Sequence, residues 1–317
     1  MKNINYLDIL KQACLITWKN KFLWFFGFLI FLGSIGSDLR VNDNGFIAQG
    51  EKNQYLITFI QNNPTLSFVL GVILILIVLV LFLLRIMAFV SIVKSVNNIK
   101  LYQQLSTTSI LKESGSYLGK LIWLEIIVGS ALFVIGFVLA IPVLYLFALK
   151  AKILSYFALA LAISIALPLI ILAYYLIKYG SFYVILTNER LRVALESAYA
   201  LFSKNIKDSL IMGLIIVMAN IALVATLLLL LLPAVIVFAP LGLIAHLLFA
   251  KTAAIVVAGI AILVYLIIAV AIVSWYESFV QTCWLLFFQQ IAFEKHKDKE
   301  VAAELEVVVK TVTPESI

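Results

Sequence analysis

Long apolar runs separated by short polar segments dominate the chain. A helix of about 20 apolar residues crosses the ~30 Å hydrocarbon core of a bilayer. The pattern predicts six such spans, at residues 18–37, 66–85, 121–142, 153–177, 210–232 and 252–276. The second span continues as an apolar helix to residue 93, and the third ends either at Pro142 or near Leu149. We therefore predict an all-α, polytopic membrane protein whose spans form three pairs.

One apolar segment has two interpretations. Residues 210–250 contain no Asp, Glu, Lys or Arg, but Pro233 and Pro240 interrupt them. Proline removes a backbone donor and clashes with the preceding turn. We therefore interpret residues 233–250 as an interfacial or re-entrant piece, and a seventh span is the alternative. The tail at residues 293–317 is charged and is expected to be mobile and cytoplasmic, after a single membrane domain at residues 1–292.

The basic residues indicate an orientation. With six spans and the N-terminus inside, 17 Lys and Arg residues fall in inner segments and 5 in outer ones. Lysine and arginine accumulate in cytoplasmic loops, so both termini are predicted in the cytoplasm. Residues 6–18 precede the first apolar run, which favours an uncleaved span over a signal peptide. All five tryptophans fall near the predicted inner ends, where tryptophan favours the headgroup level.

A pattern of Leu, a small residue and Lys precedes three of the spans. Its copies are Leu10, Ala13 and Lys19; Leu111, Ser114 and Lys120; and Leu195, Ala198 and Lys204. Each copy predicts a short amphipathic helix on the inner surface, ending in a basic residue where a span begins.

A second pattern ends each unit of the repeat. Tyr179-Gly-Ser-Phe182 matches Tyr276-Glu-Ser-Phe279, and Ile86-Met-Ala-Phe89 is a weaker copy. The chain is thus predicted to contain three parallel units, at about residues 6–93, 108–186 and 191–283. Each unit would consist of a surface helix, a span out and a span back.

The repeat also identifies candidate interfacial residues. Arg85, Lys178 and Trp275 each lie four residues before the closing Phe, at the inner end of a span. We interpret Arg85 as reaching the headgroups rather than a buried substrate. The full set of candidate lipid-contacting residues is Lys19, Arg85, Lys120, Lys178, Lys204 and Trp275.

Two further polar residues fall in predicted spans. Asn220 lies near a membrane midplane, where a lone Asn more often joins helices than forms a site. Glu125 lies near the inner surface, either solvated at headgroup level or paired with Arg85.

Composition narrows the class of protein. Apolar residues make up 64% of the 317 residues and charged residues 12%, and the mean hydropathy is +1.14. These values exclude a soluble globular enzyme, a disordered chain and a disulfide scaffold. The net charge of +7 comes from Lys and Arg in short loops, so we predict no nucleic-acid partner. Cys14 and Cys283 are interpreted as small buried hydrophobic residues.

Candidate catalytic chemistry is sparse. His246 and His296 cannot form a familiar metal site with the cysteines, and no phosphate-binding loop or nucleophile elbow occurs. A calcium-loop pattern in residues 40–51 has Arg40 where a carboxylate is required. We therefore predict no enzyme activity, no cofactor and no metal.

Several segments resemble a known family. The stretch from Phe182 to Leu186, residues 194–205 and the Leu-rich span ending at Pro233 resemble the membrane domain of glycerophosphoryl diester phosphodiesterase. Residues 9–28 and 88–98 fit the same bacterial membrane-domain family. The resemblance implies a stand-alone protein of the bacterial inner membrane, and it carries over no catalytic residue, since the phosphodiesterase barrel is absent.

The sequence favours a non-enzymatic membrane scaffold or lipid-interacting component. Its partners would be membrane lipids, especially anionic ones, and a protein partner or a second copy of the chain. The alternative is a transporter or permease-like component for a lipid or small apolar solute. The transporter hypothesis is based on the repeat and on the prolines at positions 142, 168, 233 and 240.

Overall fold

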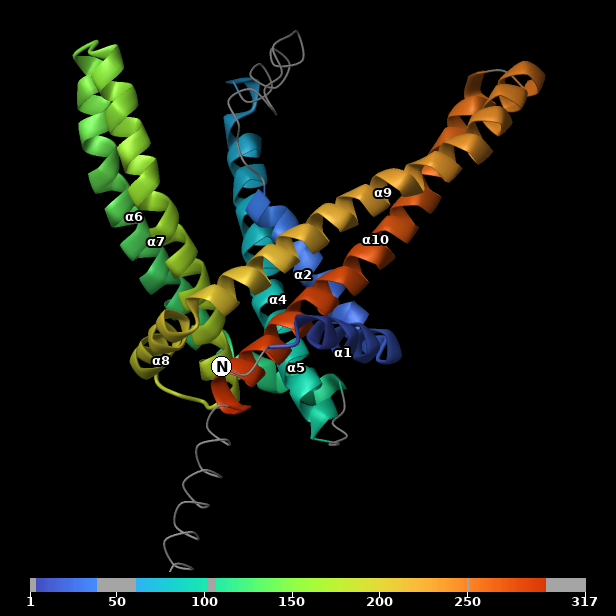
Figure 1. Cartoon of the computed structure of the whole chain (residues 1–317). Coiled ribbons are helices and arrows are strands. Elements are labelled where there is room, and N and C mark those ends of the chain that lie inside the picture. The colour runs from blue at the N-terminus through green and yellow to red at the C-terminus, as the bar shows by residue number, and fades with distance from the viewer. Residues whose placement is uncertain (1–3, 39–60, 102–106, 250, 295–317) are drawn as a thin grey trace, which may run out of the picture. The chain divides into compact units, whose positions relative to one another are not determined.

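The fold is entirely helical in the part of the chain that the structure describes. A computed structural model describes residues 4–38, 61–101, 107–249 and 251–294 (Figure 1). In these ranges the protein is 94% helix and contains no strand. The prediction of an all-α, polytopic helical membrane protein is confirmed. The predicted calcium-loop mimic in residues 40–51 and most of the charged tail lie outside the described residues.

In the described residues, the main helices form three groups. Each group consists of one short helix followed by two longer helices. The first group is α1 (Tyr6–Lys19), α2 (Phe22–Asp38) and α4 (Pro64–Lys100). The second is α5 (Thr107–Ser114), a 3-10 turn η1 (Gly115–Tyr117), α6 (Leu118–Ala148) and α7 (Lys152–Leu186). The third is α8 (Leu191–Lys204), α9 (Ile206–Phe249) and α10 (Lys251–Gln289), followed by a π-helical turn η2 (Gln290–Glu294).

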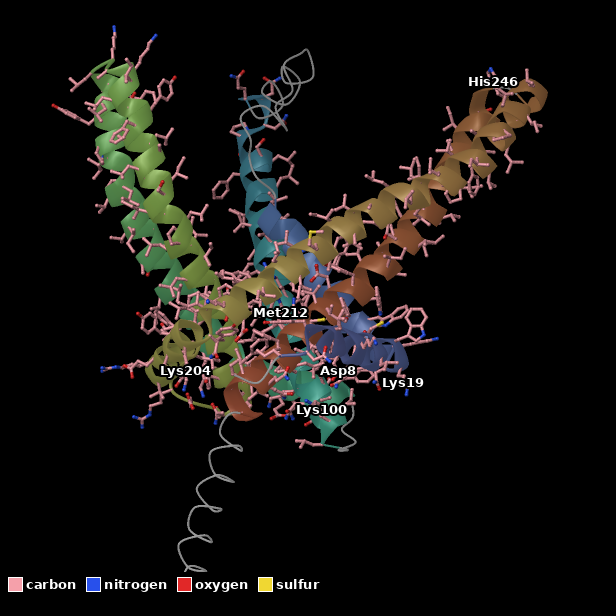
Figure 2. All side chains as sticks on the ribbon, viewed as in Figure 1. Asp8, Lys19, Lys100, Lys204, Met212 and His246 are labelled. Atoms are coloured by element: carbon pink, nitrogen blue, oxygen red, sulfur yellow. The ribbon has the colours of Figure 1, made fainter. Side chains whose placement is uncertain are left out.

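Five of the described helices are long and apolar enough to cross a membrane by themselves. They lie at Pro64–Lys100, Ser109–Ala148, Lys152–Leu186, Ile206–Leu247 and Ile255–Phe293. At most 11% of the residues in the most apolar stretch of each are buried within the protein. Side chains project outward along the length of these helices (Figure 2). Such a surface suits contact with lipid rather than with water.

The predicted first span takes a different form. Helix α2 has only 17 residues. It follows α1 at an angle of 103° after a break at Asn20 and Lys21. The two helices meet the length and apolarity required of a span only when taken together. The structure thus contains five candidate spans, and six if the bent pair counts as one.

The predicted break at Pro233 is wrong. Helix α9 continues through Pro233 and Pro240 to Phe249, as one helix of 44 residues. Residues 233–249 therefore form neither a separate re-entrant piece nor a separate seventh span. Proline interrupts a helix strongly in water, but membrane helices tolerate it because neighbouring groups compensate for the lost hydrogen bond. Helices α6 and α7 likewise continue through Pro142 and Pro168.

The chain forms two compact units. One consists of residues 1–13, 116–218 and 282–317, and the other of residues 14–115 and 219–281. We call them the first and the second unit. In the first unit, α6 and α7 form a helical hairpin, and α8 packs against α7. In the second unit, α2 packs against α4, and α4 packs against α5.

Two glycines let α2 approach its neighbours closely within the second unit. A Cβ atom at Gly27 would lie 1.9 Å from the carbonyl oxygen of Ser274 in α10. A Cβ atom at Gly33 would lie 2.4 Å from Cβ of Arg85 in α4. The hydroxyl of Ser278 donates to the Leu23 carbonyl at 2.6 Å beside the first contact. Small residues and hydroxyl groups commonly join helices in membranes, and here they hold α2 between α4 and α10.

One single-residue expectation was wrong. Cys14 is exposed on α1 rather than buried, whereas Cys283 is buried as expected. Trp284 is only 1% exposed, and its ring meets the edges of Tyr175 and Phe287. The position of its ring at headgroup level stays a prediction.

Candidate functional site

The candidate residues at the short helices lie at equivalent places. Lys19 ends α1 and Lys204 ends α8, and both side chains are exposed (Figure 2). Lys120 lies at the start of α6 and is half-buried. Each lysine therefore stands close to the junction between a short helix and the helix that follows it.

The pattern of Leu, a small residue and Lys, which opens each repeat unit, has the same buried positions in its three copies. The residue before the opening Leu is buried in every copy, and so is the small residue. These residues are Ile9 and Ala13, Ile110 and Ser114, and Ala194 and Ala198. A spacing of four residues places both on one face of a helix. Each short helix thus buries the same face.

The closing pattern behaves in the same way. Its first and third residues are buried in all three copies. These residues are Ile86 and Ala88, Tyr179 and Ser181, and Tyr276 and Ser278. The sequence comparison alone could not show that residues of such different size occupy similar environments. The threefold repeat itself stays a prediction.

The three residues that precede the closing Phe differ in their surroundings. Arg85 is exposed, and its Cβ lies beside Gly33. Lys178 is half-buried, with Nζ 5.7 Å from the centroid of the Phe182 ring. A cation at that distance from an aromatic face is attracted to it. Their proposed contact with headgroups stays a prediction.

Trp275 belongs to an aromatic cluster of the second unit. Its ring stacks on Phe279 at 5.6 Å and meets the edge of Trp18 at 6.2 Å. Trp18 also contacts Trp24 at 5.7 Å, and Trp24 Nε1 donates to the Thr17 carbonyl at 2.9 Å. These contacts fix the bend between α1 and α2, because the residues lie on either side of it.

Helix α1 has an exposed face of mixed character. Leu7, Leu15 and Trp18 are 69%, 57% and 60% exposed, and Lys11 lies among them. Ile9 and other residues of the opposite face are buried. An apolar stripe with tryptophan and flanking lysines is the surface with which interfacial helices enter the headgroup region. Lys19 extends this face at the end of the helix.

Helix α1 is anchored to the first unit through Tyr6. The Tyr6 hydroxyl donates to Asp208 Oδ1 at 3.0 Å, and its ring stacks on Phe287 at 6.4 Å. Partial burial, and then the hydrogen bond to the Asp208 carboxylate and its charge, raise the pKa of Tyr6 to about 12. Tyr6 therefore stays protonated and keeps donating throughout the physiological range.

A buried tyrosine–serine network lies beside this anchor. Tyr175 donates to the carbonyl oxygen of Ser209 at 2.7 Å, and Tyr179 donates to Ser209 Oγ at 2.8 Å. Trp284, Phe202 and Phe288 surround the two tyrosines. Sequence reasoning missed this network. The spacing of four between Tyr175 and Tyr179 was the available signal, but nothing in the sequence named Ser209 as their partner.

Lys120 has a structural role in addition to its predicted one. Its Nζ donates to Asn188 Oδ1 at 2.8 Å. Asn188 has a φ of 54°, a left-handed conformation that Asn tolerates better than most residues. The bond therefore joins the start of α6 to the turn between α7 and α8.

The two predicted intramembrane polar residues do not form a buried site. Asn220 is exposed on α9, and Glu125 is half-buried on α6. Asn220 and Arg85 belong to the second unit and Glu125 to the first. The alternative that Glu125 pairs with Arg85 stays a prediction. Within the described residues, no three His, Cys, Asp or Glu side chains are grouped to hold a metal ion.

Comparison with known proteins adds no identification. No protein family matches the chain, and neither does any curated protein or solved structure.

Proposed function

We propose that this protein is a non-enzymatic scaffold of the bacterial inner membrane that binds anionic lipid through its short amphipathic helices. Helix α2 serves as the sixth span, and both termini lie in the cytoplasm. The resemblance to the phosphodiesterase membrane domain belongs to the same proposal. The observation that carries it is the exposed face of α1, where Leu7, Leu15 and Trp18 accompany Lys11 and Lys19.

The physical basis is a combination of two attractions. Apolar side chains of such a face enter the acyl boundary, while lysines interact with anionic headgroups. Each Lys near an anionic surface contributes about 1 kcal/mol, which is roughly a fivefold change in affinity. The net charge of +7 and the position of Lys19 and Lys204 at the ends of short helices fit this role.

The test compares two pairs of lysines. Lys19→Gln with Lys204→Gln removes the charges at the short helices. The matched control, Lys150→Gln with Lys152→Gln, removes two charges at the α6–α7 turn. Each protein is reconstituted in nanodiscs of mixed zwitterionic and anionic phospholipid, and native mass spectrometry measures the retained anionic lipid. We expect up to a fivefold loss of enrichment per lysine in the first variant and little change in the control. Equal retention in both variants would contradict the proposal.

A lipid or solute permease remains the second candidate function. The threefold order of helices still favours it, because internal repeats are common in transporters, although the units here are predicted to be parallel rather than inverted. The prolines inside the apolar segments favour a permease less than expected, because α6, α7 and α9 continue through them without a break. Flux of labelled lipid in liposomes, compared with protein-free liposomes, tests this candidate. Flux that requires the protein would favour it over the scaffold.

A further inference from the structure

An apolar groove runs along one side of the α9–α10 hairpin. It has a volume of about 370 Å³ and lies wholly within the second unit. Its lining includes four alanines, two on each helix, together with Phe238 and Tyr265. The alanines are Ala234 and Ala239 of α9, and Ala258 and Ala261 of α10.

The groove exists because short side chains face one another there. Alanine fills little space, so two helices in contact leave a depression where alanines occupy both sides. Phe238 and Tyr265 add flat aromatic walls. A little nearer the turn, a Cβ atom at Gly242 would lie 4.0 Å from Cγ1 of Val257, an ordinary van der Waals contact between the two helices. The groove therefore results from the four alanines at this place on the hairpin.

The groove offers no hydrogen-bonding group to an occupant. Tyr265 has the only polar side chain in the lining, and its hydroxyl donates to the Leu227 carbonyl at 3.3 Å. All other lining residues are Ala, Leu, Val, Ile or Phe. An occupant must accordingly be apolar along its length.

The position of the groove identifies the medium around it. Both helices contain candidate spans, and no residue in their most apolar stretches is buried within the protein. At 1.5 Å per residue, the lining residues lie roughly 12–28 Å along the helices from the turn. From a turn at the edge of a ~30 Å hydrocarbon core, this range runs from near the bilayer midplane into the opposite leaflet, so acyl chains surround the groove.

We propose that this groove is a binding site for one acyl chain of a membrane lipid. A methylene group has about the size of a water molecule, ~30 Å³, so 370 Å³ holds about a dozen of them. A second helix, with a diameter of about 10 Å, would need a longer and wider surface. This site deepens the proposed lipid interaction, but it uses different residues and a different part of the lipid.

The test uses a phosphatidylcholine with a photoreactive acyl chain. The full-length protein is reconstituted in nanodiscs with this lipid, irradiated, and digested for mass spectrometry. We expect labels to concentrate on the lining residues of α9 and α10 rather than to spread evenly over the exposed faces. Even labelling around the hairpin would overturn the proposal.

Matched variants separate filling of the groove from general perturbation. Ala258 and Ala239 are exposed lining residues, so Ala258→Phe and Ala239→Phe each fill the groove from one helix. Ile260→Phe is the control, because Ile260 is 52% exposed on α10 outside the groove. We expect at least a fivefold loss of groove labelling in both Ala variants and none in the control. Unchanged labelling in the Ala258→Phe and Ala239→Phe variants would overturn the site.

The outcome is distinguishable from failure of the proposed function. Labelling of the groove should not depend on headgroup charge, whereas retention of lipid by the short helices should. Loss of groove labelling in the Lys19→Gln, Lys204→Gln variant would show that the two sites are not independent and would contradict this assignment.

Discussion

Tyr179 donates its hydroxyl proton to Ser209 Oγ at 2.8 Å and thereby joins α7 to the first turn of α9. The same serine accepts a second bond at its carbonyl oxygen from Tyr175. Ser209 is fully buried, so water cannot replace either donor. The start of α9 is thus held by two tyrosines that lie one helical turn apart.

Removing one of these hydroxyls should lower stability. Tyr179→Phe keeps the ring but leaves Ser209 Oγ without this donor, and a typical hydrogen bond contributes about 0.5–1.5 kcal/mol. We expect a lower thermal midpoint in detergent than for the parent protein. Tyr199→Phe is the control, because Tyr199 is 56% exposed on α8. Equal midpoints for the two variants would show that the bond contributes nothing.

The contact of α2 with α10 should not tolerate even one added carbon. Gly27→Ala places a Cβ 1.9 Å from the backbone oxygen of Ser274, and overpacking of this kind costs about 1–3 kcal/mol. Gly259→Ala on α10 meets no atom within 4 Å and should be neutral or slightly stabilising. Thermal unfolding of both variants in the same detergent measures the difference. A stable Gly27→Ala variant would mean that α2 does not pack as described.

The anchor of α1 should weaken at high pH. The pKa of Tyr6 is about 12 in the folded protein and 10.0 for an ordinary tyrosine. Below pH 10 the group is protonated in both states, and its contribution to stability is complete. Between about pH 10 and 12 the unfolded state loses its proton first, so stability falls as the pH rises.

Comparison with a variant isolates this effect. Tyr6→Phe removes the titrating group and the bond to Asp208, so it should be less stable at neutral pH. Its further loss between pH 10 and 12 should be smaller than that of the parent protein. Stability curves in denaturant at several pH values measure both quantities. If the stability of both proteins fell equally between pH 10 and 12, Tyr6 would not be the group responsible for the loss.

The sequence predicted most helices well, because long apolar runs have few alternatives in a membrane. The pattern of Leu, a small residue and Lys also predicted short helices before three of the spans, and Lys19 and Lys204 do end such helices. The continuity of α9 did not follow, since the effect of Pro233 depends on its surroundings rather than on its identity. The environment decides whether the lost hydrogen bond can be compensated.

The contacts of the two anchors were beyond prediction for a different reason. Tyr6 and Asp208 are separated by 202 positions in the chain. Ser209 resembles any other serine near the start of a span. Only the three-dimensional structure brings such residues together. The common burial of Ala13, Ser114 and Ala198 shows, in contrast, how a weak sequence pattern can point to a shared environment.

The short connections between paired helices bear on how the protein is made. Helix α9 ends at Phe249 and α10 begins at Lys251, while three residues separate α6 from α7. Connections this short leave no long loop between the two helices of either hairpin. During synthesis, α6 must therefore enter the membrane together with α7, and α9 together with α10.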